Sequence, residues 1–157
     1  MIMKKVIWRM LSDFEICRIA HLERGIDRCI PDLHQLAWEW GRLDCFLFLE
    51  RERIAGFILI DPACAWLPGS IRIVKLRFSW EYNREEVICE MIRSAAAAYL
   101  PSGAAYVCLD VEKRRDVNYS LYRKLGFLES PMQSPCAQGH SVLIAPMDTL
   151  NAGSCAL

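Results

Sequence analysis

The sequence has no excess charge of either sign and no apolar run of membrane length. Nineteen Lys and Arg residues balance nineteen Asp and Glu residues, so the chain has no general electrostatic attraction to nucleic acid or to an anionic membrane. Its longest uncharged stretches, residues 94–109 and 130–147, are interrupted by proline and polar residues. A membrane helix needs about 20 apolar residues. We therefore predict no nucleic-acid partner and no membrane partner.

A secretory signal and a Cys-x-x-Cys motif are also missing. Residues 1–9 do not contain the apolar segment of a signal peptide, and the eight cysteines are spread along the chain. We therefore expect a cytoplasmic protein whose thiols are reduced and mostly buried. The chain is 54% hydrophobic and 24% charged, which is typical of a folded protein. Its length predicts a single domain over residues 1–150, with residues 151–157 as a frayed tail.

Apolar periodicity predicts strands and helices in an α/β order. The predicted strands cover residues 6–10, 45–49, 54–60, 71–78, 105–111, 127–129 and 141–145. The predicted helices follow Ser12 and Pro31 and then cover residues 84–100 and 116–125. Ser12 and Glu15 have the spacing of a capping box at the start of the first helix.

A short sequence near the carboxy terminus narrows this order to one family. Residues 120–127 read Ser-Leu-Tyr-Arg-Lys-Leu-Gly-Phe and follow a predicted strand that ends in Leu-Asp-Val. This segment resembles the carboxy-terminal signature of the GNAT-type N-acetyltransferases, and the element order over residues 5–147 is similar to that family's fold. The resemblance implies an α/β (α+β) fold with a central mixed, mostly antiparallel sheet of about six to seven strands and about four flanking helices.

The same resemblance implies an activity and a co-substrate. Members of the family transfer an acetyl group from acetyl-coenzyme A to an amine by direct attack, so the protein positions the reactants and stabilises charge. The acceptor expected here is a small-molecule or peptide amine, and the protein is expected to be a monomer or a homodimer. By the same resemblance, residues 71–78 end in a bulge whose backbone N–H near Phe78 faces the thioester oxygen.

The turn expected to bind the pyrophosphate departs from the family's pattern. By the resemblance, this group lies at the start of the long helix, where free N–H groups and the helix dipole favour an anion. The aligned cofactor-binding residues are Asn83, Arg84, Glu85, Glu86, Val87 and Ile88. The family has a glycine-rich turn here, whereas this segment has no glycine and two glutamates that repel phosphate. One alternative is therefore a non-catalytic binding or regulatory protein that kept the fold and lost acetyl-coenzyme A.

Two further positions depart from the family. Arg115 stands where an asparagine usually touches the cofactor, and with its basic neighbours it could hold phosphates by charge or lie on a solvated loop. Trp80 stands where proline is usual, so its ring could reshape or close the cleft.

The resemblance also suggests acid and base residues. Tyr122 is the predicted general acid, which returns a proton to the leaving thiolate; the other interpretation is a ring that anchors the last helix to the sheet. Glu81 is the predicted base for the acceptor ammonium, and Asp110 is the alternative. Each carboxylate could equally be an exposed or capping group.

Other residue patterns were weighed against simpler interpretations. Cys17 with His21, and Cys136 with His140, have a spacing that would suit zinc on a helix. The second pair lies in a segment with proline and glycine, so we predict no metal site. Finally, four tryptophans could line an acceptor pocket or belong to the core, namely Trp38, Trp40, Trp66 and Trp80, and the resemblance favours Trp38 and Trp40 on the second helix for the pocket.

Overall fold

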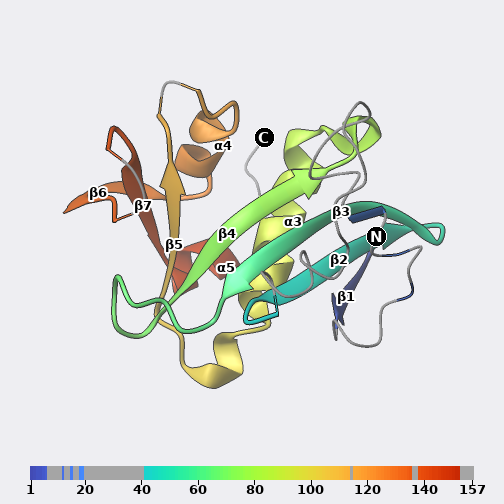
Figure 1. Ribbon diagram of the computed structural model, residues 1–157, viewed down its shortest axis with the longest axis horizontal. Helices are drawn as coiled ribbons and strands as arrows, with labels where there is room; N and C mark the ends of the chain where they lie inside the picture. The colour runs from blue at the N-terminus through green and yellow to red at the C-terminus, as the bar shows by residue number, and fades with distance from the viewer. Residues whose placement is uncertain are drawn as a thin grey trace.

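The structure is a computed structural model that describes residues 1–6, 12, 15, 18–19, 41–113, 115–135 and 138–152. A seven-stranded sheet with the order β1-β2-β3-β4-β5-β7-β6 forms its centre (Figure 1). Only β4 and β5 pair in parallel, and the other neighbouring strands are antiparallel. The predicted mixed, mostly antiparallel sheet is thereby confirmed.

The described elements follow the predicted order, with α5 as an additional helix after the last strand, whereas the helix predicted after Pro31 lies outside the described residues. The strands are β1 (Ile2–Val6), β2 (Asp44–Glu50), β3 (Arg53–Asp61), β4 (Ser70–Phe78), β5 (Tyr106–Val111), β6 (Leu128–Gln133) and β7 (Ser141–Pro146). The helices are α3 (Glu85–Ala97), α4 (Tyr119–Lys124) and α5 (Met147–Ala152), with the 3-10 turns η2 (Trp80–Tyr82) and η3 (Leu100–Ser102). No helix in the described part of the chain is both long and apolar enough to cross a membrane.

The described residues near the ends of the chain add to the prediction. β1 covers Ile2–Val6, an edge strand held by backbone pairing to β2 that needs little apolar pattern; of the strand predicted over residues 6–10, only Val6 lies in the described part. Ser12 and Glu15 form the predicted capping box, since the Glu15 N–H donates to Ser12 Oγ at 3.2 Å and the Ser12 N–H donates to Glu15 Oε2 at 2.9 Å. Residues 151 and 152 belong to α5, whereas residues 153–157 lie outside the described part.

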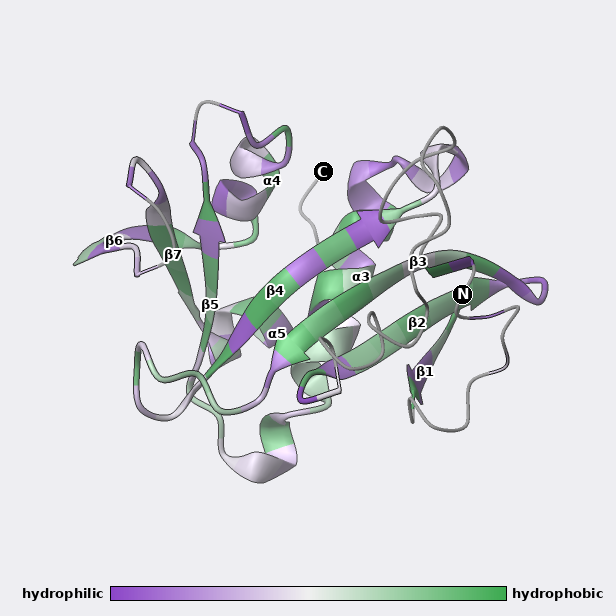
Figure 2. Cartoon of the chain, viewed as in Figure 1, coloured by the Kyte–Doolittle hydropathy of each residue, from purple (hydrophilic) through white to green (hydrophobic). Residues whose placement is uncertain are grey.

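The hairpin strands β2 and β3 are apolar and buried on both faces, as their sequence predicted. One core cluster joins the strands to α3, α4 and α5, and a second cluster on other strand residues includes Ile19, which is fully buried. β3 is apolar along most of its length, whereas β4 alternates apolar and polar residues (Figure 2). The cysteines that the structure describes are buried thiols outside disulfides, namely Cys45, Cys64, Cys89 and Cys108.

Gly56 allows α3 to pack close to the middle of the sheet. A Cβ at this position would lie 2.5 Å from the Arg77 carbonyl oxygen and 2.6 Å from Met91 Cε. Only a residue without a side chain therefore fits between β4 and α3. This packing fixes the helix behind the half of β4 that forms the site described below.

Candidate functional site

β4 and β5 separate halfway along their length (Figure 1). They pair only from Ser70 with Tyr106 to Ile73 with Leu109. On the opposite edge, β4 shifts its register against β3 so that Val74 is an extra residue between Ile73 and Lys75. A bulge bends a strand and increases its twist, which directs the second half of β4 away from β5. The bulge expected near Phe78 therefore lies at Val74.

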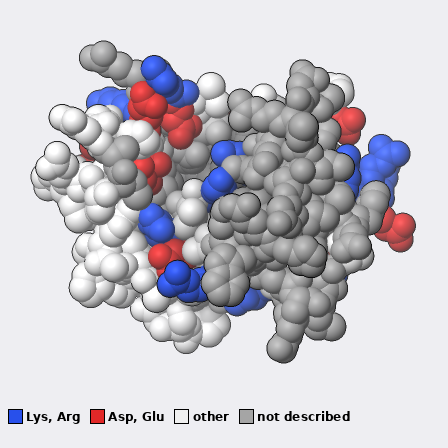
Figure 3. Space-filling view, viewed as in Figure 1, with Lys and Arg blue, Asp and Glu red and all other residues white. Residues whose placement is uncertain are grey.

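A cavity of about 330 Å³ opens between the diverging strands. Its walls are residues 73–77 of β4, residues 109–111 of β5, residues 115–118 of the next loop and Tyr122 of α4. The acidic and basic side chains that Figure 3 shows on one face are interspersed. This agrees with the balanced charge of the whole chain.

The open edge of β4 offers backbone groups to this cavity. The Ser79 N–H donates to the Ala55 carbonyl of β3 at 2.8 Å. Because N–H directions alternate along a strand, the N–H groups of Leu76 and Phe78 point away from β3, on the side that β5 has left. Leu76 lines the cavity and Phe78 does not. The cavity wall thus includes a backbone N–H two residues before the donor predicted at Phe78.

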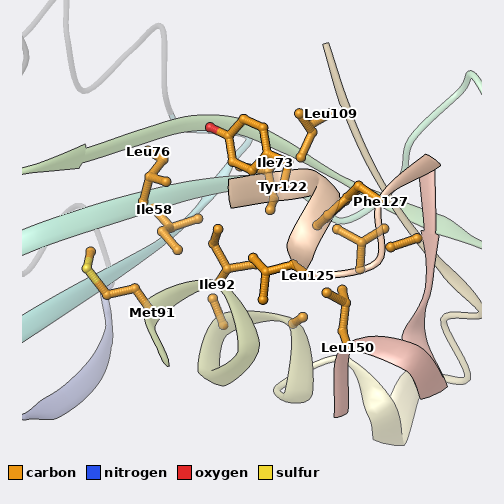
Figure 4. Packing of buried hydrophobic residues seen from close by; sticks show 14 of the residues in the cluster. Ile58, Ile73, Leu76, Met91, Ile92, Leu109, Tyr122, Leu125, Phe127 and Leu150 are labelled. Atoms are coloured by element: carbon orange, nitrogen blue, oxygen red, sulfur yellow. The ribbon is translucent and has the colours of Figure 1, made fainter. Parts of the chain in front are cut away.

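Tyr122 contributes a phenol to the same cavity. The residue is only 7% exposed, and its ring packs edge-on against Phe127 with the ring centroids 6.0 Å apart. Figure 4 shows the ring above the apolar cluster with its hydroxyl pointing away from Phe127. Burial, reinforced by the charge of Asp116, raises the pKa of Tyr122. The phenol therefore stays protonated at neutral pH, and the ring also anchors α4, so both predicted roles are compatible with the structure.

Glu81 lies in a different place from Tyr122. It belongs to η2 and lines a second cavity of about 330 Å³, together with residues that include Arg18, Arg53 and Tyr82. It is not among the residues that line the β4–β5 cavity, whereas the alternative base, Asp110, is. Tyr122 and Asp110 thus line the same cavity, and Glu81 lines the other.

Asp110 is the centre of a hydrogen-bonded cluster that the sequence did not reveal. The Ser134 hydroxyl donates to its Oδ1, and His140 Nδ1 lies 2.6 Å from its Oδ2. The carboxylate side chain is 15% exposed and the imidazole 28% exposed. Ser134 and His140 are 24 and 30 positions away from Asp110 along the chain, so no local spacing signals the cluster.

The start of α3 presents free backbone groups and a paired glutamate. Arg84 is the N-cap and has extended backbone angles and no capping side-chain bond, so the first N–H groups of the helix have no helical acceptor. Lys124 Nζ lies 2.9 Å from Glu85 Oε1 and 3.1 Å from its Oε2. The ion pair offsets part of the predicted repulsion. Asn83 and Glu86 are exposed as well, and the next two positions are progressively buried, namely Val87 and Ile88.

Two further predicted residues are exposed. Trp80 is 82% exposed and is not a wall residue of the β4–β5 cavity, so its ring does not close it. Arg115 lines the cavity with a side chain that is 82% exposed, and its Nε lies 3.2 Å from Glu112 Oε1. Lys113, its near neighbour in the basic run, pairs with Glu129 at 3.2 Å. The basic run is thus both part of the wall and a solvated surface.

The zinc alternative and the acceptor wall fall largely outside the described residues. In the ranges that the structure describes, no group of three or more His, Cys, Asp and Glu side chains is placed to hold a metal ion. His140, one of the four residues with zinc-like spacing, is described and pairs with Asp110. The other three and the two tryptophans of the second helix lie outside the described part, namely Cys17, His21, Cys136, Trp38 and Trp40.

Comparison with solved structures identifies the class of fold. The aminoglycoside 6'-N-acetyltransferase from Enterococcus faecium superposes with a TM-score of 0.71 at 10% identity, over 94% of this chain and 97% of the other. A spermidine N-acetyltransferase chimera from Vibrio cholerae has a TM-score of 0.72 at 11% identity, over 98% and 100% of the two chains. A Bacillus subtilis acetyltransferase in complex with coenzyme A has a TM-score of 0.65 at 13% identity, over 92% and 97%.

These similarities confirm the fold predicted from the sequence. The chain has the fold of the GNAT-type N-acetyltransferases, and the match extends over nearly all of both chains. No protein-family model matches the sequence, and no curated protein matches it. At such low identity the property that the chains share is the fold.

Proposed function

We propose that this protein is an N-acetyltransferase that moves an acetyl group from acetyl-coenzyme A to the primary amine of a small molecule or peptide. The observation that carries the proposal is the cavity between the diverging halves of β4 and β5, with the Tyr122 phenol in its wall. Solved structures with this fold include enzymes named for aminoglycoside and spermidine acetylation and one complex with coenzyme A. These names support an amine acceptor and a coenzyme A donor.

The open edge of β4 suits the extended arm of coenzyme A. An arm that carries amide groups can pair with the outward N–H group of Phe78 as an added strand would, and the Leu76 N–H remains for the acyl carbonyl. The first turn of α3 offers further N–H groups to the pyrophosphate, and residues 83–86 form its surface there. Lys124 and Arg115 supply positive charge. When bound, acetyl-coenzyme A supplies an acyl group activated as a thioester.

The wall residues have distinct roles in the proposed transfer. The Leu76 N–H donates to the oxyanion that develops on the acyl carbonyl. Tyr122 holds its proton at neutral pH, as a phenol does at its ordinary pKa, and burial raises that pKa further; it donates the proton to the leaving thiolate. We place the base at Asp110 and its partners instead of at Glu81, because Asp110 shares the cavity with Tyr122.

Thermal unfolding with acetyl-coenzyme A tests the proposal. A ligand at 100 times its dissociation constant stabilises the folded state by about 2.7 kcal/mol, so a clear upward shift in Tm is expected at millimolar concentration. Adenosine diphosphate is the matched control, because it has a pyrophosphate and no pantetheine arm, and it is expected to give a smaller shift. Thiol release with spermidine or an aminoglycoside as acceptor then measures transfer. A protein that acetyl-coenzyme A does not stabilise contradicts the proposal.

One observation favours a second function. The segment at the start of α3 has no glycine and carries two acidic side chains in its first turn, Glu85 and Glu86. Such a turn is suited to helix stability, since acidic side chains at this end interact favourably with the helix dipole. The second candidate is therefore a binding or regulatory protein with this fold that does not bind acetyl-coenzyme A. The same unfolding experiment separates the two functions.

A further inference from the structure

We propose that His140, oriented by Asp110 and Ser134, is the general base that takes the proton from the acceptor ammonium. The inference rests on the proposed transfer to an amine and adds the residue that activates that amine. It is carried by the positions of three side chains: Asp110 of β5, Ser134 directly after β6 and His140 directly before β7.

Strand register places the imidazole on the same face of the sheet as Asp110. Val142 pairs with Asp110, and side chains two positions apart on a strand share a face, so His140 continues the row that Val142 begins. The alternate residues Val111 and Leu143 belong to the core cluster around α3. The cluster therefore lies on the sheet face opposite α3, at the end of β5 where Asp110 lines the cavity.

The hydrogen bonds leave the imidazole as the available base. Both oxygens of Asp110 are engaged, one by the Ser134 hydroxyl and one by His140 Nδ1. A neutral imidazole that donates from Nδ1 has its lone pair on Nε2, so the carboxylate selects the tautomer that can accept a proton. His140 is not itself a wall residue of the cavity that Asp110 lines, but its imidazole side chain is 28% exposed, so an acceptor can reach the ring from the solvent side.

The charged groups near the cluster are paired with one another. Lys113, after β5, lies 3.2 Å from Glu129 of β6, and Arg115 lies 3.2 Å from Glu112. Among the residues that the structure describes, Asp110 is thus the charged group in direct contact with the ring. A carboxylate beside an imidazole stabilises the imidazolium that forms when the ring accepts a proton.

The proposed steps balance. His140 Nε2 takes one proton from the acceptor ammonium, and the free amine nitrogen attacks the thioester carbon to form the C–N bond. The C–S bond then breaks, and the departing thiolate takes the proton of Tyr122. The amide nitrogen loses its second proton through solvent to the Tyr122 phenolate, and His140 releases its own proton to water. The net products are the acetylated amine, coenzyme A thiol and one proton.

The first test is independent of the acceptor. Nitrogen-15 NMR of the wild-type protein, at a pH where the ring is neutral, is expected to show His140 protonated on Nδ1 and bare on Nε2. The signal is assigned by its loss in His140→Asn. A ring that carries its proton on Nε2 overturns the inference, because that nitrogen then has no lone pair for the ammonium proton.

The second test measures transfer. His140→Asn keeps a donor for Asp110 and removes the base, so kcat/KM is expected to fall about 10²–10⁴-fold while acetyl-coenzyme A binding stays the same. Part of the rate is expected to return with added imidazole. Glu129→Gln is the matched control on the neighbouring strand and is expected to keep the wild-type rate.

The outcomes separate this inference from the proposed function. A wild-type protein that does not bind acetyl-coenzyme A overturns the proposed function. A wild-type protein that transfers acetyl groups, together with a folded His140→Asn variant of equal rate and equal pH profile, overturns only the role of His140. If that variant does not fold, His140→Gln takes its place in the same comparison, and the NMR result stands without either variant.

Discussion

Tyr122 belongs both to the apolar core and to the wall of the β4–β5 cavity. Its ring contributes packing, and its hydroxyl contributes a proton that burial holds in place by raising the pKa. A phenol that stays protonated at neutral pH can act only as an acid there. At the scale of the residue, the two contributions can be separated by removing the oxygen and keeping the ring.

We expect Tyr122→Phe to keep the fold and to lose transfer. The free energy of unfolding should change by less than about 1 kcal/mol, whereas kcat should fall about 10²–10⁴-fold because the thiolate leaves without its acid. Urea unfolding and thiol release measure the two effects. Tyr119→Phe is the matched control in the same helix, since the Tyr119 hydroxyl lies 3.3 Å from Glu129 and is outside the cavity wall. Equal activity in both variants would show that Tyr122 only packs.

At the scale of the element, one ion pair joins the start of α3 to the end of α4. Lys124 holds the Glu85 carboxylate at the place where the proposed pyrophosphate binds. Both side chains are substantially exposed, so the pair contributes at most about 1 kcal/mol to stability. Its larger effect is on binding, because a lysine that pairs with glutamate is less available to phosphate.

Glu85→Gln is therefore expected to tighten acetyl-coenzyme A binding. The substitution removes one negative charge and releases Lys124, and together these should lower Kd about threefold to tenfold, which corresponds to about 1 kcal/mol. Isothermal titration calorimetry measures the change. Glu86→Gln removes a charge without releasing Lys124 and should have a smaller effect, and Glu90→Gln, further along α3, should have none. Weaker binding in Glu85→Gln would mean that the ion pair itself shapes the site.

Gly56 controls how closely α3 approaches the sheet. Gly56→Ala is expected to destabilise the fold by about 1–3 kcal/mol, because the new methyl group would overlap the Arg77 carbonyl and Met91. Gly69→Ala is the comparison, since it meets no atom within 4 Å and costs only its positive φ of 75°, about 1 kcal/mol. Urea unfolding of both variants measures the difference. A smaller loss in Gly56→Ala would mean that α3 shifts freely.

The sequence predicts the individual strands and helices better than it predicts how the strands pair with one another. The hairpin of residues 45–60 and the helix that begins near residue 84 are recognisable because apolar periodicity is a local property. The bulge at Val74 depends on how β4 pairs with β3, and the contact between Asp110 and His140 depends on how β5 pairs with β7. Pairing between distant segments has no signal in a single sequence. Only the resemblance to the GNAT family therefore gives reason to expect the cavity.

At the scale of the whole molecule, buried acidic groups make stability depend on pH. Burial, with a smaller contribution from Asp44, raises the pKa of the Cys45 thiol from 9.0 to about 12. The unfolded thiol ionises near pH 9 while the folded thiol remains protonated. The contribution to stability is therefore complete below pH 9 and is lost as the pH rises from 9 to 12. Burial and a hydrogen bond to Asp44 raise the pKa of Tyr99 in the same direction.

We expect Cys45→Ala to weaken this pH dependence. Between pH 8 and pH 10 the wild-type protein should lose about 1.4 kcal/mol of unfolding free energy through Cys45, and the variant should not have this loss. Urea unfolding under reducing conditions at the two pH values measures it, with each protein as its own reference at pH 8. A variant with the same loss as the wild type would place the thiol in contact with water.

The hydrogen-bonding groups along the open edge of β4 belong to the main chain. Every amino acid except proline supplies the same N–H, so mutation can replace the side chains of this strand while the groups that face the cavity persist. Evolution must conserve the extra residue that tilts the strand. This depends on the number of residues between the paired positions more than on which amino acid stands there. Distant homologues of such a protein are therefore better recognised by comparing strand register than by sequence identity.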